Sequence, residues 1–253
     1  MAQKERLEYI VQIVRLNKKV FVTKLSEKLE VTPETIRRDL ERLEAAGLVK
    51  RIYGGAVLRE EDFSEKVNFL KRAKTNINEK QRIAVLASEY VPANASIGCD
   101  ASSTAQELLA VLGDREDLLV LTNSAKAVKD LDHTKYRLLS TGGYVNRQSY
   151  SLQGIMARNV VQGYHLDMVF IGCRGIRRDG GIFDSHEMES DMKKMLIEHG
   201  NRVYLLADHT KFDCVGLEKT ADLTQIDAVI TDRKPSEEWM RLLKEKGVEV
   251  CCP

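Results

Sequence analysis

The sequence predicts an α/β protein of two domains, in which a small helical domain with a β-hairpin precedes a larger domain with a mainly parallel sheet. The chain has 253 residues, of which 43% are hydrophobic, a length that suits a large domain alone or with a small one. Residues 1–59 hold 13 lysines and arginines against 8 acidic residues, whereas the other 194 residues hold 26 against 30. Apolar residues follow a helical spacing first and form short strand-like runs beyond Glu79. These observations separate a basic N-terminal domain from an acidic second domain.

The charge balance and the apolar runs also limit the class of protein. The net charge of +1 gives no reason to expect a polyanion or a membrane as partner of the whole chain, although residues 1–59 carry a local net charge of +5. The N-terminus lacks the apolar core of a signal peptide, and no later run approaches the roughly 18 apolar residues of a membrane span. We therefore expect a cytoplasmic protein without a membrane partner.

The cysteines do not predict a metal centre. The sequence contains five of them, Cys99, Cys173, Cys214, Cys251 and Cys252. They form no CxxC pair and no cysteine–histidine spacing suited to zinc, which favours reduced structural thiols. We expect neither a metal nor a cofactor.

The N-terminal domain begins with two predicted helices. Between Lys4 and Leu16 the apolar residues recur at spacings of three and four, which is typical of one buried helix face. A short β-branched stretch then leads into a second helix of about two turns, in which Leu25 and Leu29 are four residues apart. We expect Thr23 to cap the start of this second helix.

A third helix follows after a tight turn. Thr32 followed by Pro33 is typical of a helix start, because the threonine hydroxyl can accept a free N–H group and proline fits the first helical position. Ile36, Leu40 and Leu43 share one face of this helix, which we expect to pack against the first two helices.

A hairpin, or wing, closes the first domain. Gly47 stands where a helix C-cap is expected, and the following LVKRIYGGAVL alternates before it turns at Gly54 and Gly55, as a small two-stranded hairpin would. A charged stretch with few apolar residues comes next and predicts a partly helical linker. The expected boundaries are residues 1–58 for the first domain, 59–78 for the linker and 79–253 for the second domain.

These elements describe a winged helix-turn-helix, in which the last helix enters the major groove of DNA and the wing meets the flanking backbone. Arginine can donate two hydrogen bonds to a guanine edge, and basic residues on the rim neutralise phosphates. The alternative is a solvated helix face with local ion pairs, which is the usual role of an Arg-Arg-Asp sequence. The candidate DNA-contacting residues are Thr23, Thr32, Thr35, Arg37, Arg38, Lys50, Arg51 and Tyr53.

Beyond Glu79, apolar runs alternate with segments of helix length. The runs are ASIGC, LLVLT, YRLLS, DMVFIG, RVYLLA, DAVIT and VEVCC. Such alternation predicts a mainly parallel sheet covered by helices.

Polar loops follow several of these runs. CDASSTAQELL passes from a strand into a helix, so Ser102 to Thr104 would surround the positive end of that helix, where a phosphate fits. The alternative is an ordinary serine or threonine N-cap. LTNS, STGG, GCRG and LADHTK also follow strands, and loops of this kind gather at the carboxyl edge of a parallel sheet. Asp100, Asn123, Arg174, Asp208 and Lys211 would there supply the carboxylates, amides and cations that bind a phosphorylated sugar.

The segment VTPETIRRDLERLEAAGLVKRIYGGA, residues 31–56, closely resembles the N-terminal signature of the DeoR/GlpR family of bacterial transcriptional regulators. Its Thr-Ile-Arg-Arg-Asp-Leu core and the Gly-Gly-Ala after the wing are highly specific. The second half is similar to that family's sensor domain, since it contains CDASST, LTNS, TGG, Gly154, GCRGI, a Glu189–Lys193 pair and ADHTKF in that order. In the family's Asp-x-Gly-Ser/Thr-Thr loop, this chain has Ser102 in the place of the glycine.

This resemblance implies a sensor domain of the ribose-phosphate isomerase and CoA-transferase type. The candidate ligand-binding residues are Asp100, Ser102, Ser103, Thr104, Asn123, Gly142, Gly143, Arg174, Glu189, Lys193, Asp208 and Lys211. For Glu189 and Lys193, four residues apart on a helix, an ion pair with each other is the alternative to a ligand role. Isomerases of this type have an Asp-Gly-Ala-Asp-Glu strand end with the acid and base, whereas this chain has Gly-Cys-Arg-Gly-Ile at 172–176.

The sequence therefore predicts a DNA-binding transcriptional regulator that is not an enzyme, a repressor of a sugar-catabolism operon relieved by a phosphorylated sugar. One alternative is a sugar-phosphate isomerase-like enzyme with an appended nucleic-acid-binding head, and another is an interaction module whose basic head binds acidic protein. The expected partners are double-stranded operator DNA and the sugar effector. Because symmetric operators match symmetric proteins, we also expect a homo-oligomer, a dimer or tetramer formed largely through the second domain.

Overall fold

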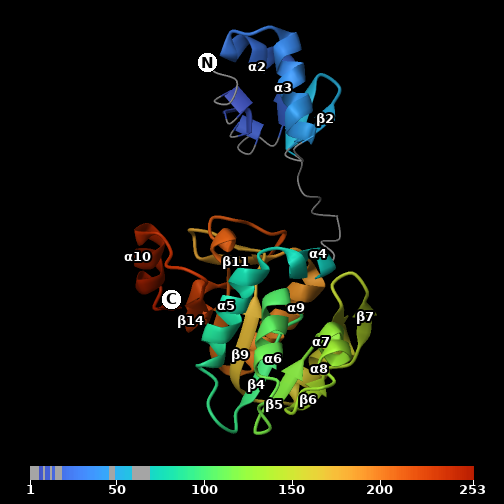
Figure 1. The fold of residues 1–253 in the computed structure, drawn as a ribbon, viewed down its shortest axis with the longest axis vertical. Helices are drawn as coiled ribbons and strands as arrows, with labels where there is room; N and C mark the ends of the chain where they lie inside the picture. Colours follow the sequence, from blue (N-terminus) through green and yellow to red (C-terminus); the bar gives the residue numbers. More distant parts are fainter. Residues whose placement is uncertain (1–5, 8, 12, 15–18, 46–48, 59–68) are drawn as a thin grey trace. The chain divides into compact units, whose positions relative to one another are not determined.

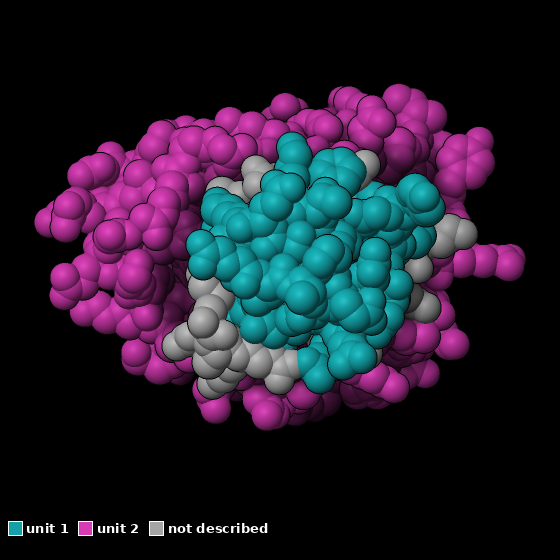
Figure 2. Space-filling view, turned by 90° about the horizontal axis from the view of Figure 1, so that it is seen from above, with its two compact units in different colours: residues 1–65 teal, residues 66–253 magenta. Residues whose placement is uncertain are grey.

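The computed structural model describes every residue except 1–5, 8, 12, 15–18, 46–48 and 59–68 (Figure 1). The chain divides into two compact units, Met1–Glu65 and Lys66–Pro253, which Figure 2 colours separately. The division falls within the stretch 59–78 that the sequence analysis assigns to a linker. Each unit has a hydrophobic core of its own.

The first unit combines helices with a small antiparallel sheet. Residues 6–7, 9–11 and 13–14 are helical, and α2 (Val22–Leu29) and α3 (Pro33–Ala45) follow. The sheet has the strand order β1-β3-β2, formed by β1 (Lys19–Phe21), β2 (Val49–Ile52) and β3 (Gly55–Leu58). The two-stranded hairpin predicted from the sequence is therefore incomplete. The β-branched stretch before α2 is its third strand, because Val20 pairs with Ala56 and both are buried.

The helix ends agree with the sequence in one case and differ in another. The Thr32 hydroxyl accepts the Thr35 N–H at 3.3 Å directly before α3, as predicted. Thr23 does not cap α2, because the preceding strand runs directly into the helix and Phe21 takes the capping position without a side-chain hydrogen bond. Glu30 forms the left-handed turn between α2 and α3, with φ of 51°.

The buried face of α3 is the predicted one. Ile36, Leu40 and Leu43 are between 0% and 4% exposed and share the first core with Ile10 and Val14. The predicted C-cap at Gly47 lies outside the described residues.

The second unit is built on a seven-stranded sheet in which all pairings are parallel. Its strand order is β15-β14-β12-β9-β4-β5-β6. The strands are β4 (Ser96–Cys99), β5 (Leu119–Thr122), β6 (Arg137–Ser140), β9 (Leu166–Gly172), β12 (Gly200–Leu206), β14 (Ala228–Ile230) and β15 (Glu249–Cys251). Each contains one of the seven apolar runs, so the predicted parallel sheet is confirmed.

Helices cover both faces of this sheet, as Figure 1 shows. They are α5 (Ile77–Ser88), α6 (Ser103–Val111), α7 (Ala125–Asp130), α8 (Ile155–Gln162), α9 (Glu187–Glu198) and α10 (Glu237–Glu245), whereas the short helix α4 (Phe69–Lys74) contacts α6. Neighbouring strand residues serve opposite cores. Val120 packs with the side chains of α5 and α6, whereas Leu121 packs with those of α8 and α9.

Two smaller sheets lie outside the predicted pattern. One contains β10 (Gly175–Ile176), β11 (Gly181–Asp184) and β13 (Glu218–Asp222), and the other is the hairpin of β7 (Tyr144–Asn146) and β8 (Ser151–Gln153). Two 3₁₀ turns, η1 (His209–Lys211) and η2 (Leu223–Gln225), complete the described elements. In the described part of the chain, no helix is both long and apolar enough to cross a bilayer.

Candidate nucleic-acid interface and ligand site

The exposed face of α3 presents two arginines beside one carboxylate. Arg37 Nη1 lies 3.1 Å from Glu34 Oε2, and Arg38 Nε lies 3.8 Å from Glu34 Oε1. The arginine side chains are 55% and 71% exposed, and the three groups together keep a charge of +1. Exposed ion pairs contribute only about 0–1 kcal/mol, so phosphate or base-edge contacts can replace them at little cost. The arrangement is compatible with both the DNA-contacting role and the solvated-face alternative.

The three candidate threonines occupy different places. The hydroxyls of Thr32 and Thr35 lie 2.9 Å apart at the start of α3, where Thr32 is exposed and Thr35 is half-buried. Thr23 is exposed on α2, and its backbone carbonyl accepts the Ser26 hydroxyl at 2.8 Å. Its side chain therefore remains on the surface, although not as the predicted cap.

The wing carries three exposed candidates, one of which is also held by contacts with α3. Arg51 is tied to α3, because its backbone N–H donates to Glu44 Oε1 at 2.8 Å and its guanidinium donates to Glu41 Oε1 at 2.6 Å. Lys50 is exposed on β2, and Tyr53 is fully exposed in the turn before β3. These contacts hold the wing in a fixed register against α3.

A buried ion pair that the sequence analysis missed lies beneath this surface. Arg6 Nε donates to Asp39 Oδ2 at 2.5 Å and Arg6 Nη2 donates to Asp39 Oδ1 at 3.3 Å, while Asp39 is 0% exposed. The hydrogen bond to Asp39 raises the pKa of Arg6. The aspartate of the Arg-Arg-Asp sequence thus joins α3 to the first helix. The sequence analysis missed this pair because its two residues are 33 positions apart and form no local pattern.

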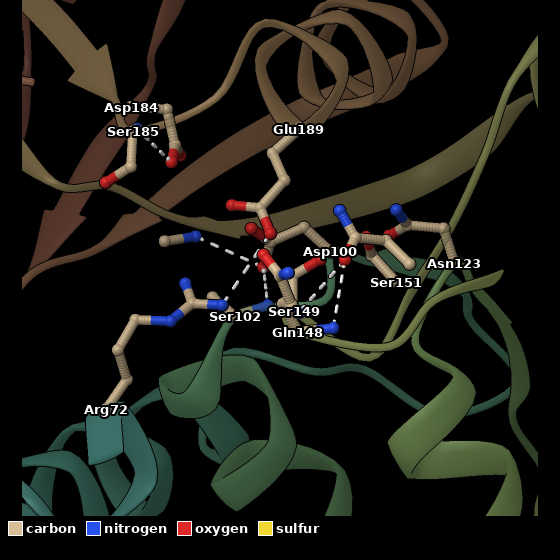
Figure 3. A network of polar contacts seen from close by, with 12 residues as sticks. Arg72, Asp100, Ser102, Asn123, Gln148, Ser149, Ser151, Asp184, Ser185 and Glu189 are labelled. Carbon is tan, nitrogen blue, oxygen red and sulfur yellow. Dashed lines mark hydrogen bonds and ion pairs between the residues drawn. The ribbon is translucent and has the colours of Figure 1, made fainter. Parts of the chain in front are cut away.

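The floor of the candidate ligand site is the turn between β4 and α6 (Figure 3). Asp100 Oδ1 accepts the N–H groups of Ser102 at 3.2 Å and of Gly172 at 3.3 Å. Ser102 is the N-cap of α6, since its hydroxyl accepts the Ala105 N–H at 3.2 Å, and Ser103 and Thr104 are the buried first residues of the helix. The N-cap alternative is therefore observed.

Lys193 is buried between two carboxylates. Its Nζ lies 3.1 Å from Asp100 Oδ2 and also contacts Asp184 Oδ2. Burial opposes the charge of Lys193, but Asp184 and Asp100 outweigh it and raise the pKa of this ammonium well above its ordinary value. The direct ion-pair partners of Lys193 are therefore Asp100 and Asp184, at the ends of β4 and β11, while Glu189 acts on Lys193 only as a nearby charge.

Glu189 has a different partner, Arg72 of α4. Arg72 Nη2 lies 3.7 Å from Glu189 Oε1, and Figure 3 shows the arginine reaching from α4 toward the carboxylate. Burial raises the pKa of Glu189, and the neighbouring charge of Asp184 acts in the same direction. The sequence analysis did not single out Arg72, because it lies in the charged stretch assigned to the linker.

Asp208 and Lys211 lie together after β12. Lys211 Nζ is 3.9 Å from Asp208 Oδ2, while Asp208 Oδ1 accepts the Thr210 N–H at 3.0 Å and Asn76 Nδ2 at 3.3 Å. Burial would raise the pKa of Asp208, but the Lys211 charge and these hydrogen bonds lower it. Lys80 of α5 is close by, and its burial, with the Lys211 charge, lowers its pKa to about 8.

Asn123 joins the β5 end to the β7–β8 hairpin. The backbone carbonyl of Asn123 accepts the Leu152 N–H at 2.7 Å, and its side-chain Nδ2 donates to the backbone carbonyl of Leu152 at 3.2 Å. Figure 3 shows its side chain beside Ser151 and Ser149, whose hydroxyls are 2.8 Å apart.

The remaining candidates are two glycines and Arg174, whose backbone contacts are as follows. Gly142 and Gly143 form the turn after β6 with φ of 61° and 102°, and a Cβ on Gly143 would stand 2.5 Å from the Gln153 carbonyl. Arg174 is half-buried after β9, and its N–H donates to the Phe183 carbonyl at 2.8 Å.

Unsatisfied polar atoms are concentrated at this edge. In the described part of the chain, eight buried side-chain atoms have no hydrogen-bond partner, and six of these belong to residues at the carboxyl edge of the sheet or in contact with it. The six are Arg72 Nε, Asp100 Oδ2, Asn123 Oδ1, Glu189 Oε1, Asp208 Oδ2 and Thr231 Oγ1. Buried polar groups are ordinarily hydrogen-bonded, so a cluster of exceptions marks a place where a polar ligand can bind.

Comparisons with known proteins agree with the division of the chain into two units. Residues 6–62 match the family model of the DeoR-like helix-turn-helix domain, and residues 75–233 match that of the DeoR C-terminal sensor domain. The HTH-type transcriptional regulator GolR of Listeria innocua is 34% identical over 249 residues, which cover 97% of this chain and 97% of that protein. The glycerol-3-phosphate regulon repressor of Escherichia coli is 29% identical over 255 residues, 99% of each chain.

Among solved structures, ribose 5-phosphate isomerase A from Methanocaldococcus jannaschii is similar in fold. The match covers 55% of each chain with a TM-score of 0.42 and 17% sequence identity. This likeness concerns the fold alone.

Proposed function

Because this chain belongs to the DeoR family of transcriptional regulators, we propose that it binds operator DNA through α3 and the wing and responds to a phosphorylated sugar bound in its second domain. In this proposal the protein is a repressor of a sugar-catabolism operon, and the sugar phosphate relieves repression. The name of the E. coli relative, a glycerol-3-phosphate regulon repressor, supports an effector that combines hydroxyl and phosphate groups.

The observation that carries the sugar half of this proposal is the set of unsatisfied acceptors. Asn123 Oδ1, Glu189 Oε1 and Asp208 Oδ2 are buried oxygens without a hydrogen-bond partner among the described residues, and Asp100 Oδ2 has only its ion pair with Lys193. A carboxylate or amide oxygen accepts hydrogen bonds only, so its natural ligand group is a hydroxyl. A polyhydroxyl compound offers several hydroxyls at once, and leaving such oxygens unpaired costs about 1–3 kcal/mol each.

Cations near the same edge favour a phosphate on that sugar. Lys211 is half-buried beside Asp208, Arg72 is half-buried beside Glu189, and the pKa of Lys80 is lowered in part by the charge of Lys211. The α6 N-terminus, with buried Ser103 and Thr104, adds the positive end of a helix dipole.

At the DNA, we propose that Arg37 and Arg38 contact base edges and that Lys50, Arg51 and Tyr53 meet the backbone. The exposed arginines project from the helix face opposite the buried Ile36, as a recognition helix requires. Thr23, Thr32 and Thr35 are proposed backbone contacts through their hydroxyls.

We also propose that the second domain binds its sugar phosphate without converting it. The isomerase alternative requires an acid and a base at the end of β9, where this chain has Gly172, Cys173 and Arg174. Incubation of the full chain with ribose 5-phosphate, followed by NMR, should show no ketose product. Product formation at a rate proportional to protein concentration would support the isomerase instead.

The proposal is tested with the full chain in two steps. Thermal unfolding is first followed with glucose 6-phosphate, fructose 6-phosphate, ribose 5-phosphate and sn-glycerol 3-phosphate, each beside its unphosphorylated counterpart. A true effector at 100 times its Kd stabilises the native state by about 2.7 kcal/mol. The affinity for an operator selected from random duplexes is then measured with and without the compound that stabilises most.

A matched pair of variants locates the site. Lys211→Gln should weaken the response to the sugar phosphate and leave operator binding unchanged, whereas Lys219→Gln, an exposed lysine paired with Asp222, should behave as wild type. Asp100 is unsuited to this test, because its carboxylate also holds two backbone N–H groups and the buried Lys193. A Lys211→Gln variant with the full response would place the phosphate elsewhere.

A further inference from the structure

Helix α4 is the first described helix of the second unit, and it begins on a loop of the candidate ligand site. The Phe69 N–H donates to the Gln148 carbonyl at 2.8 Å, and the Phe69 ring packs edge-on against Tyr150 with 5.9 Å between ring centroids. Both partners lie in the turn between β7 and β8. The same turn is tied to the β5 end, because the Ala125 N–H donates to the Tyr150 carbonyl at 2.8 Å.

The middle of α4 contacts a second part of the site through Arg72. The pair that Arg72 makes with Glu189 is incomplete, since the closest atoms are 3.7 Å apart. Arg72 Nε and Glu189 Oε1 are both buried without a hydrogen-bond partner among the described residues. One side chain thus has a donor to spare and the other an acceptor, although their charges are opposite and adjacent.

The end of α4 contacts a third part of the site. Asn76, which follows the helix, donates from Nδ2 to Asp208 Oδ1 at 3.3 Å and to the Thr210 hydroxyl at 3.2 Å. Lys80 Nζ donates to the carbonyl of Thr75 at 2.6 Å and to that of Arg72, so α5 holds the last turn of α4 in place. Two loops of the candidate site and helix α9 therefore contact this short helix or the residues that directly follow it.

We propose that α4 reports effector occupancy, with Arg72 binding an anionic oxygen of the effector in place of Glu189 and Asn76 transmitting the state of the Asp208 loop. This inference rests on the proposed function and adds to it a ligand-binding residue and an element that couples the site to the DNA-binding unit. Residues 59–68 join α4 to that unit in sequence. A change in α4 is therefore a change at the point where the chain enters the second unit.

The chemistry of the Arg72–Glu189 pair defines the part of the effector that it binds. Arg72 offers a charged donor, which prefers a phosphate or carboxylate oxygen, and Glu189 offers an acceptor, which prefers a hydroxyl. An effector with an anionic group close to a hydroxyl satisfies both atoms at once. In this proposal Arg72 contacts Glu189 without the effector and the anionic oxygen with it, so the effector's binding energy differs between these two positions of the Arg72 side chain, as any shift of population requires.

The test separates binding from coupling in the full chain. Sugar-phosphate affinity is measured by calorimetry, and operator affinity is measured with and without glucose 6-phosphate, ribose 5-phosphate or sn-glycerol 3-phosphate, with inorganic phosphate as the minimal anion. Arg72→Gln should weaken sugar-phosphate binding by on the order of tenfold, because a charge-assisted hydrogen bond is lost. Asn76→Gly keeps the left-handed backbone at φ 52° and should retain that binding, but lose most of a coupling of about fivefold or more.

Arg82→Gln, an exposed arginine on α5, is the matched control and should bind and respond as wild type. If Arg72→Gln and Asn76→Gly both keep the wild-type response to a sugar phosphate that binds wild type, α4 does not report occupancy, and the proposed function still stands. If none of the sugar phosphates changes the operator affinity of wild type, the proposed function and this inference are both overturned.

Discussion

Asp39 shows how one residue of a surface motif can serve the interior. It stands between the exposed Arg38 and the buried Leu40, and its carboxylate is held by Arg6 from the first helix. Arg42 is a weaker second partner at 3.6 Å. The Arg6–Asp39 pair ties α3 to the first helix. The direction in which the exposed arginines of α3 point depends on the position of that helix.

Arg6→Ala should destabilise the first unit by about 3 kcal/mol, because removing one partner of a buried pair leaves the other charge uncompensated. Amide hydrogen exchange of Ile36 and Leu40 in α3 measures this loss directly. The single tryptophan, Trp239, is buried in the second unit, so its fluorescence should report an unchanged unfolding transition there. Arg37→Ala, which removes an exposed pair, is the control and should change exchange little; an equally small effect of Arg6→Ala would contradict the structural role.

Glu189 should make the stability of the second unit depend on pH. Its pKa in the folded protein is raised above the ordinary value of 4.5, chiefly by burial. The stabilisation from its protonated form is therefore complete below that value and is lost as the pH rises through the folded pKa. Relative to wild type, Glu189→Gln should gain stability as the pH rises above the ordinary value of 4.5, as measured by urea unfolding with Trp239 fluorescence.

Glu187→Gln is the control for Glu189, because it removes an exposed carboxylate from the same turn of α9. A difference between wild type and Glu189→Gln that stays constant with pH would show that burial does not shift this carboxyl group.

The local sequence pattern predicted the partner of a side chain only where that partner lies in the same short segment of the chain. The Thr32 cap follows from its own position before Pro33, and it is confirmed. For Lys193 the sequence offered a ligand role or an ion pair with Glu189, four residues away, yet two aspartates from separate strand ends surround it. Such partners depend on tertiary packing, which residue spacing does not contain.

At the scale of the element, α3 concentrates the proposed base contacts. Arg38→Ala should weaken binding to the selected operator by about 1–3 kcal/mol and relax the preference at one base position. The substitution should leave the hydrophobic core intact. The Arg38 side chain is 71% exposed, so the melting temperature should hardly change. Operator titration at fixed salt tests this, with Arg82→Gln of the second unit as control, and an unchanged affinity would remove Arg38 from the interface.

The apolar composition of an element, more than its length, decided whether the sequence revealed it. All seven strands of the parallel sheet lie in apolar runs, because both faces of each strand are covered. The hairpin of β7 and β8 and the sheet of β10, β11 and β13 were missed, since strands of two to five residues with mixed polarity lack a clear period. Asp184 ends one of these missed strands, and so it was absent from the predicted site.

Helix α4 illustrates the same limit for function. Its sequence FLKRAK carries three cations within six residues and was assigned to a linker. Buried contacts of Phe69 and Arg72 with residues far along the chain make it part of the candidate site. Composition predicted its charge but not its neighbours.

At the scale of the whole molecule, we expect a symmetric oligomer. A two-fold operator is matched by a protein with two recognition helices related by the same symmetry. Sedimentation of the full chain, whose monomer mass is 28.6 kDa, should give a dimer or tetramer, and one oligomer should bind one operator with both half-sites. A monomer that binds a single half-site with full affinity would contradict this expectation.

The cores of the two units also differ in when they can form during synthesis. The described residues of the first core lie between Leu7 and Ala56, so this core can form soon after that segment leaves the ribosome. The centre of the parallel sheet joins β4 to β9 and β9 to β12, and it must wait for residues as far along as Leu206. Because domains fold as units and the N-terminal one is made first, an interrupted translation product would carry a folded DNA-binding unit and no sensor. We expect such a truncated product, which lacks the domain that forms the oligomer, to bind single half-sites weakly and without any response to the sugar phosphate, so full-length translation is a condition for regulated binding.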